Sequence, residues 1–315
     1  MAHNWMKQAI NYETLMGLTK RNEEEAGNTF DSLRDKGFNL DRPITERLYE
    51  VARITGFDSS ALLTEYMKTR DCFESKLPLD AQIIGPEDSR WPQQINDFPY
   101  CPRFLYIQGR MQLLQEKSIS VVGTIAPSTW GKEYSIKTAQ ALGKAGIVVV
   151  SGLSLGINSY VLAECVRNFQ STIAVISTPL GQYYPSSMKQ IQSFIAAEGG
   201  VVVSRFAPSA PIENLYQLYR NRLMSALSSG CVIVEDREAG AGVRQAKFAL
   251  EYGKKLYLYK MMVDNKDFRW PRVYAKRAGT TVVSTPLGLT RAIRGIKIKR
   301  KKKTVSTNVQ LSLFS

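Results

Sequence analysis

The sequence predicts an α/β fold: a doubly wound, mostly parallel sheet of the extended Rossmann-like kind, with a small N-terminal helical domain and a basic disordered C-terminal tail. From Ile119 onward, short apolar runs rich in β-branched residues alternate with helical stretches, a pattern typical of parallel strands buried on both faces. The first two runs end in glycine, at Gly123 and Gly152, where each strand would turn into a helix. After Asp267 the chain has no acidic residue, which predicts a basic tail.

Residues 1–79 are expected to form a helical module, because apolar residues recur there at helical spacing. Asp58, Ser59 and Ser60 supply candidate caps for the last of its helices. We expect the sheet domain to cover residues 80–290 and the tail to cover residues 291–315.

The segment from Ile83 to Gly109 contains four prolines and is expected to pack along the sheet as an extra strand; the alternative is an ordinary linker. Beyond it, strands are expected at 119–123, 147–151, 172–177, 201–205, 231–235, 255–260 and 280–284. Helices are expected between them at about 130–145, 156–168, 187–198, 214–229 and 242–253.

Composition excludes several classes of protein. The only histidine is His3, and the four cysteines are scattered without a C-x-x-C pair, so we expect no metal, no cofactor and no histidine-dependent catalytic triad. No apolar run reaches the length of a membrane helix, and the first residues lack the apolar segment of a secretion signal. These observations predict a cytoplasmic protein without a membrane contact.

The net charge of +14 is concentrated at the carboxyl end, where twelve basic residues follow Asp267. Such an end is typical of a chain that binds a polyanion, although a solubilising tail is the alternative. The tail residues expected to contact nucleic acid are Lys297, Lys299, Arg300, Lys301, Lys302 and Lys303.

The two glycine loops are candidate phosphate sites, because glycine lets backbone N–H groups approach an anion at a helix N-terminus. Their spacing is not that of the G-x-G-x-x-G dinucleotide fingerprint. Ser128 has a second interpretation, as the cap of the following helix. The candidate residues are Gly123, Thr124, Ser128, Ser151, Gly152, Gly156 and Asn158.

Three later segments add candidates. Tyr183 and Tyr184 follow the third strand of the alternating series and offer stacking surfaces for bases, or they pack over the sheet edge. Arginine donates two parallel hydrogen bonds to phosphate, which favours a binding role for the segment from Arg220 to Arg222. The remaining candidates are Asn221 between those arginines, and Gly240, Gly242, Arg244 and Lys247 after the fifth strand, where a flexible surface turn is the alternative.

Residues 122–131 and 151–158 resemble the paired signatures VGTRxPSxxG and SGLAxGID of the DNA-processing protein A (DprA/Smf) family. Residues 99–109 are similar to its PPxLYxxG element, residues 180–185 to its GLDxxYP turn, and residues 219–222 to its RRNR signature. The resemblance implies a protein that binds single-stranded DNA without catalysis, loads a RecA-type recombinase and forms a homodimer. Ile125-Ala126 replaces the arginine-bearing pair, Asn158 replaces an aspartate, and the winged-helix module of the family is absent.

The residues just before Ser315, namely Gln310, Leu311, Ser312, Leu313 and Phe314, resemble the peptide by which bacterial proteins bind the DNA polymerase sliding clamp. The alternative is five ordinary residues at a disordered end. The resemblance implies a tether to the replication clamp.

Two other functions fit parts of the sequence. A small-nucleotide sensor or a phosphoribohydrolase-like enzyme would use the same fold, but the enzyme class places a glutamate in its PGGxGTxxE loop, and residues 240–246 have none. A clamp adaptor, with the folded body serving another partner, is the third possibility. We expect a non-enzymatic DNA-binding protein.

Overall fold

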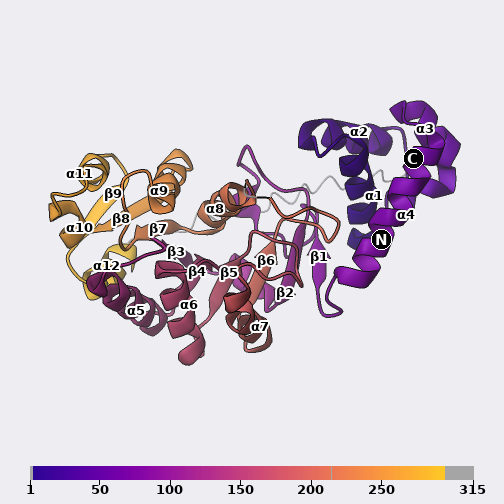
Figure 1. Cartoon of the computed structure of the whole chain (residues 1–315). Coiled ribbons are helices and arrows are strands. Elements are labelled where there is room, and N and C mark those ends of the chain that lie inside the picture. The colour runs from indigo at the N-terminus through magenta and orange to yellow at the C-terminus, as the bar shows by residue number, and fades with distance from the viewer. Residues whose placement is uncertain (1–2, 214, 295–315) are drawn as a thin grey trace, which may run out of the picture.

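The computed structural model describes residues 3–213 and 215–294. Within these ranges the chain builds one nine-stranded sheet with helices on both faces (Figure 1). The strands are β1 (Gln82–Ile84), β2 (Leu105–Gly109), β3 (Ser118–Val122), β4 (Val148–Gly152), β5 (Thr172–Val175), β6 (Val201–Ser204), β7 (Gly230–Ile233), β8 (Lys255–Tyr259) and β9 (Thr280–Val283). The predicted α/β fold class is confirmed, and each predicted strand has its counterpart.

The sheet has the order β1-β2-β6-β5-β4-β3-β7-β8-β9. All neighbours from β6 to β9 are parallel, whereas β1 and β2 are antiparallel to their neighbours. The chain order runs one way from β3 to β6 and the other way from β7 to β9, so the direction reverses between β3 and β7. In open α/β sheets, ligands commonly bind outside the carboxyl ends of the strands at such a reversal.

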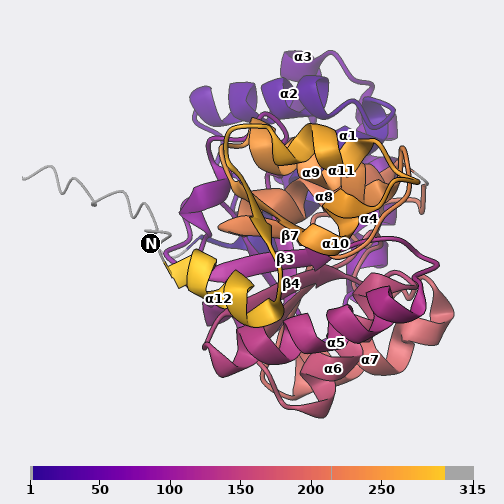
Figure 2. The same ribbon diagram turned by 90° about the vertical axis from the view of Figure 1, so that its left-hand side faces the viewer.

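Helices cover both faces of the sheet (Figure 2). One face carries α5 (Thr129–Lys144), α6 (Ile157–Arg167), α7 (Lys189–Ala197) and α12 (Pro286–Arg294), and the other carries α8 (Tyr216–Leu227), α9 (Ala241–Glu251), α10 (Lys260–Asp264) and α11 (Trp270–Ala275). Successive strand residues point to opposite faces, so Ile119 and Val121 of β3 pack with α5 and α6, while Val122 packs with α8 and α9. Burial on both faces explains why the strands are continuous apolar runs.

The N-terminal helices lie at one end of the sheet, beyond β1 (Figure 1). They are α1 (Trp5–Leu18), α2 (Glu23–Asp35), α3 (Leu48–Thr55) and α4 (Ser59–Lys76). Asp58 caps α4, as predicted, by accepting a hydrogen bond from the Ala61 amide at 2.9 Å. Phe104, directly before β2, packs at a tilt against Tyr12 and edge-on against Phe30, so the helices and the sheet share one hydrophobic core.

The proline-rich segment joins the sheet, as predicted, but it supplies two antiparallel strands instead of one added strand. No helix in the described part of the chain is long and apolar enough to cross a membrane. The predicted tail contacts at 297–303 and the clamp-like peptide at 310–314 lie outside the described residues.

Candidate functional site

The loops after β3 and β4 bind each other at the carboxyl edge of the sheet. The Ile157 amide donates to the Thr124 carbonyl at 3.0 Å, and the Thr124 amide donates to the Glu235 carbonyl at 2.7 Å. Gly156 has a φ of +77°, and a Cβ on it would lie 2.2 Å from the Thr124 oxygen. Here glycine serves the close approach of two loops, and the amides of Thr124 and Ile157 are already used by the protein.

The N-terminus of α5 already holds an anion, the carboxylate of Glu235 from the loop after β7. The Ser128 amide donates to its two oxygens at 3.2 and 3.1 Å, and the Ser128 hydroxyl donates to Oε2 at 2.8 Å. Ser128 also caps the helix by accepting from the Gly131 amide at 3.1 Å. A carboxylate is stabilised at a helix N-terminus for the same reason as a phosphate, so Glu235 occupies the place predicted for a ligand.

Asp236 fills the N-terminus of α9 in the same way. Its Oδ2 accepts from the amides of Gly242 and Val243 at 2.5 and 3.2 Å, and its Oδ1 accepts from the Arg237 amide at 2.9 Å. A Cβ on Gly240 would lie 2.2 Å from Oδ1, so glycine is needed here to admit an internal carboxylate. Burial raises the pKa of Asp236 above its ordinary value, against the effect of these hydrogen bonds.

The predicted basic residues of α9 face solvent. Arg244 donates through Nη1 to the Ala239 carbonyl at 3.2 Å, and Lys247 pairs with Glu251 at 3.6 Å. Both side chains are exposed, so they are available to a ligand but are not built into a pocket.

Arg220 on α8 is the one candidate arginine that is both deeply buried, at 5% exposure, and placed at the glycine loops. Its Nε and Nη2 donate to Asn221 Oδ1 at 3.2 and 2.9 Å, while Nη1 lies over the end of β4, where a Cβ on Gly152 would be 2.7 Å away. Burial lowers the pKa of Arg220 to about 10. No carboxylate in the described ranges pairs with it. A buried guanidinium without a counter-ion is costly, and it favours an anion from outside.

Asn158, in the first turn of α6, carries an unsatisfied polar atom. Its Nδ2 donates to Ser154 Oγ at 2.9 Å, and its buried Oδ1 has no hydrogen-bond partner in the described part of the protein. Ser151, by contrast, is committed to the fold, because its hydroxyl donates to the Val121 carbonyl at 2.8 Å. We call Arg220, Asn221 and Gly152 the Arg220 cradle.

Arg222 does not reach the Arg220 cradle, although sequence reasoning grouped the two arginines. Residues two apart on a helix face different directions. The Arg222 guanidinium carbon lies 3.5 Å from the ring centre of Tyr100 and 5.3 Å from that of Phe248. The structure therefore separates the tetrapeptide 219–222 into two sites.

A match to a family model assigns the chain to a protein family independently of the geometry of the site. The model described as DNA recombination-mediator protein A matches residues 82–284, which is more than half of the chain. This chain belongs to the DNA recombination-mediator protein A family. The match includes all nine strands and every residue of the Arg220 cradle.

A relative found by sequence comparison agrees with this family assignment. Protein Smf of Synechocystis sp. is 31% identical over 180 residues, which is 56% of this chain and 45% of that protein. The chain thus spans less than half the length of this relative.

Two solved structures of the family share the fold. DNA processing protein A from Streptococcus pneumoniae has a TM-score of 0.66 at 21% identity, covering 91% of this chain and 95% of that one. DNA processing protein A from Helicobacter pylori, which binds single-stranded DNA, has a TM-score of 0.59 at 21% identity, covering 68% of this chain and 96% of that one.

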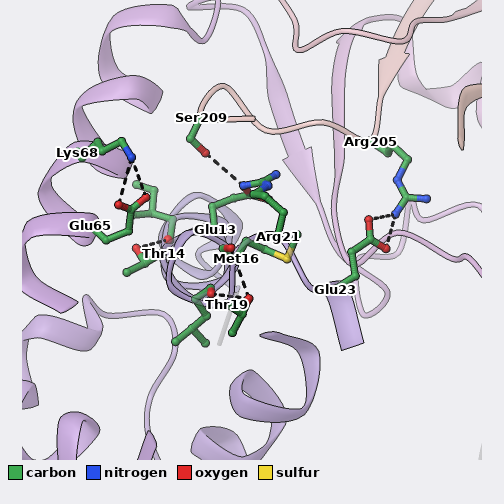
Figure 3. Close-up of polar contacts among 12 residues, drawn as sticks. Glu13, Thr14, Met16, Thr19, Arg21, Glu23, Glu65, Lys68, Arg205 and Ser209 are labelled. Carbon is green, nitrogen blue, oxygen red and sulfur yellow. Dashed lines mark hydrogen bonds and ion pairs between the residues drawn. The ribbon is translucent and has the colours of Figure 1, made fainter. Parts of the chain in front are cut away.

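The N-terminal helices hold the loop between β6 and α8, which leads to Arg220 (Figure 3). Arg205, directly after β6, donates through Nη2 to both carboxylate oxygens of Glu23 on α2 at 2.7 and 2.8 Å. Ser209 donates to Glu13 Oε2 at 3.3 Å, and Arg21 donates to the same oxygen at 2.7 Å. Burial raises the pKa of Glu13 in spite of its pairing with Arg21. No sequence motif indicated this contact.

Three large side chains stand exposed in the segments that follow strands at the carboxyl edge of the sheet. Ile125, Leu155 and Tyr184 follow β3, β4 and β5, and all three are more than half exposed. Tyr183 instead lies under the ammonium of Lys189, 5.3 Å from its ring centre.

Sequence reasoning missed Glu235 and Asp236, although two acids shortly before a glycine turn were the available signal. In the described ranges, no group of three histidine, cysteine, aspartate or glutamate side chains could hold a metal ion.

Proposed function

We propose that this chain binds single-stranded DNA without chemically altering it, and that the Arg220 cradle holds a backbone phosphate. The observation that carries the proposal is the guanidinium of Arg220, which is buried without a counter-ion among the described residues and lies over the glycine at the end of β4. A phosphodiester supplies the missing negative charge and accepts hydrogen bonds from a planar fork. Membership of the family and the DNA-binding member from Helicobacter pylori support the ligand class.

We propose that the exposed side chains of Ile125, Leu155 and Tyr184, in the segments after β3, β4 and β5, give the bases an apolar surface at the carboxyl edge of the sheet. Stacking and apolar contact of this kind tolerate any sequence, because every base has a flat face. The basic residues 297–303 add attraction that does not depend on sequence and falls with salt. We therefore propose binding with little base preference.

By its family, we propose that this protein acts in the cytoplasm as a homodimer that loads a RecA-type recombinase onto the bound strand. The peptide at 310–314 supports a further proposal, a tether to the sliding clamp. These partners rest on resemblance and on the tail sequence.

The filled helix N-termini favour DNA over a free nucleotide. A nucleotide sensor or a phosphoribohydrolase-like enzyme would place its phosphate at the N-terminus of α5 or α9. Glu235 and Asp236 already occupy these positions. The Arg220 cradle lies one strand away, over β4, and no carboxylate of the described residues occupies it.

The test is fluorescence anisotropy of a labelled oligothymidylate over a salt series. Arg220→Ala is expected to weaken binding about 10- to 100-fold, because it removes the charge-assisted hydrogen bonds that the planar guanidinium would donate to a phosphate. Arg53→Ala, which removes the same charge from an exposed position on α3, should change affinity less than about twofold.

A chain ending at Arg294 separates the folded site from the tail and leaves the buried Ile293 of α12 in place. We expect it to bind more weakly and with a shallower salt dependence, while the effect of Arg220→Ala persists. Binding that disappears with the tail and ignores Arg220→Ala would contradict the proposed site.

A further inference from the structure

A cluster of aromatic and basic side chains lies on the α8–α9 face, away from the Arg220 cradle. Tyr100, Arg222, Phe248 and Tyr252 form a layered stack. Arg222 lies 3.5 Å from the ring centre of Tyr100 and 5.3 Å from that of Phe248, and the ring of Phe248 stacks on Tyr252 at 6.2 Å with 14° between the planes. Tyr100 is the outer layer, with 44% of its surface exposed.

A shallow hollow adjoins this stack. It lies between the segment before β2, the middle of α8 and the end of α9, and most of its lining is apolar. The lining residues are Ile95, Phe98, Tyr100, Cys101, Pro102, Arg222, Leu223, Ala226 and Tyr252. The hollow is shallow and mainly apolar, so it offers a surface against which the edge of a flat ring beside Tyr100 can rest.

The charges around the hollow favour an anionic ligand. Arg222 has no ion pair in the described ranges, and its buried Nε has no hydrogen-bond partner there. Lys254 lies 5.3 Å over the ring of Phe98, with Asp97 acting on it electrostatically. A nucleotide joins a flat base to a negative phosphate and so matches both the stack and its cations.

Arg205 connects the stack to the carboxyl edge of the sheet. Its Nη1 donates to the Tyr100 carbonyl at 3.2 Å, and its guanidinium carbon lies 4.7 Å from the ring centre of Tyr219. Tyr219, Arg220 and Arg222 belong to the same helix. Arg205 and α8 thus connect Tyr100 with the Arg220 cradle.

We infer that Tyr100 and the adjoining hollow form a second subsite, which stacks a base of the same strand whose phosphate is held at Arg220. This inference rests on the proposed function. The open ring face of Tyr100 supplies the stacking surface, Arg222 fixes the ring from behind, and the cations attract the neighbouring phosphate.

The experiment compares two 12-nucleotide single strands, one of thymidylate and one with abasic residues throughout, in anisotropy titrations with the full chain. Tyr100→Ala should weaken binding of the thymidylate strand about 5- to 100-fold, the range for loss of one stacked base. The same variant should change binding of the abasic strand less than about twofold. Tyr100→Phe keeps the ring and should bind both strands as the unaltered protein does.

Two controls keep the outcome decisive. Tyr49→Ala removes an aromatic ring that is 81% exposed on α3, far from the hollow, and should not change either affinity. Tyr100→Leu keeps apolar bulk and a folded hollow, and should still lose the thymidylate preference. Equal losses on both strands, or no loss in Tyr100→Ala, would overturn the subsite. An unchanged affinity in Arg220→Ala would instead contradict the proposed function.

Discussion

Two kinds of loop stand side by side at the carboxyl edge of this sheet, and their charges are opposite. The loop after β7 sends carboxylates into the N-termini of α5 and α9, so those helix ends are satisfied from within. The loop after β4 meets the guanidinium of Arg220, which has no internal counter-ion in the described ranges. Both loops need glycine. Gly240 leaves room for the carboxylate of Asp236, and Gly152 leaves room for the guanidinium of Arg220. A glycine loop alone therefore does not identify a phosphate site.

The comparison also explains where a ligand can bind. The sheet reverses its strand order between β3 and β7, where a Rossmann-like fold usually places its cofactor. Glu235 lies at this reversal and binds Ser128 across it. Because an internal acid fills the reversal, we place the proposed anion site at the end of β4.

Among the substitutions that compare these two regions, the largest effect on DNA binding should come from one methyl group added at Gly152, the last residue of β4. In Gly152→Ala the new Cβ would lie 2.7 Å from Arg220 Nη1, so the guanidinium must leave its place. We expect single-stranded DNA affinity to fall about tenfold or more, approaching the loss in Arg220→Ala.

Gly27→Ala is the matched control for this change. Gly27 lies within α2, and a Cβ added to it would meet only Arg103 Nη2, at the ordinary contact distance of 3.5 Å. DNA affinity should be unchanged, and thermal unfolding should show equal or greater stability. If Gly152→Ala binds DNA as well as Gly27→Ala does, Arg220 is not held in the place that binding requires.

A smaller effect, on stability and not on binding, is expected in the filled loop. Glu235→Ala leaves the Ser128 amide and the N-terminus of α5 without their carboxylate, which should lower the free energy of unfolding by about 1 kcal/mol. Denaturant unfolding measures this loss, and anisotropy should find DNA affinity within about twofold of the unaltered protein. A large loss of DNA binding would show that Glu235 serves the ligand site and not the fold.

The smallest effect is a change in pH dependence at Asp236. Burial raises the pKa of Asp236 in the folded protein, so its contribution to stability is fully present below its unfolded value and is lost as pH rises through the folded value. The side chain at position 236 does not titrate in Asp236→Asn. The free energy of unfolding of this variant should therefore fall less as the pH rises. Unfolding followed from about pH 4 to pH 7 gives the slope, and identical slopes in the two proteins would contradict the assignment.

Much of the fold was predictable because periodicity records burial directly. Each strand from β3 to β9 is an apolar run close to its predicted position, since the runs pack against helices on the sheet. The antiparallel pairing of β1 and β2 was not predictable from a short segment broken by prolines, because register depends on distant partners.

The site was predicted less completely. Arg220 and Gly152 were recognised as candidates, and the structure brings them together. Grouping Arg222 with Arg220 was contrary to helix geometry, since two residues correspond to roughly half a turn. Glu235 and Asp236 were overlooked because an acid at a helix N-terminus becomes visible only when the strand that delivers it is placed beside that helix.

The most direct test of this account is a crystal structure of the full chain with a short oligothymidylate, in which the phosphates are located. The account predicts a phosphate within hydrogen-bonding distance of Arg220 Nη1, with Glu235 and Asp236 still bound to the N-termini of α5 and α9. A phosphate at Ser128 or Gly242 that displaces either carboxylate, with Arg220 left without an anion, would contradict it.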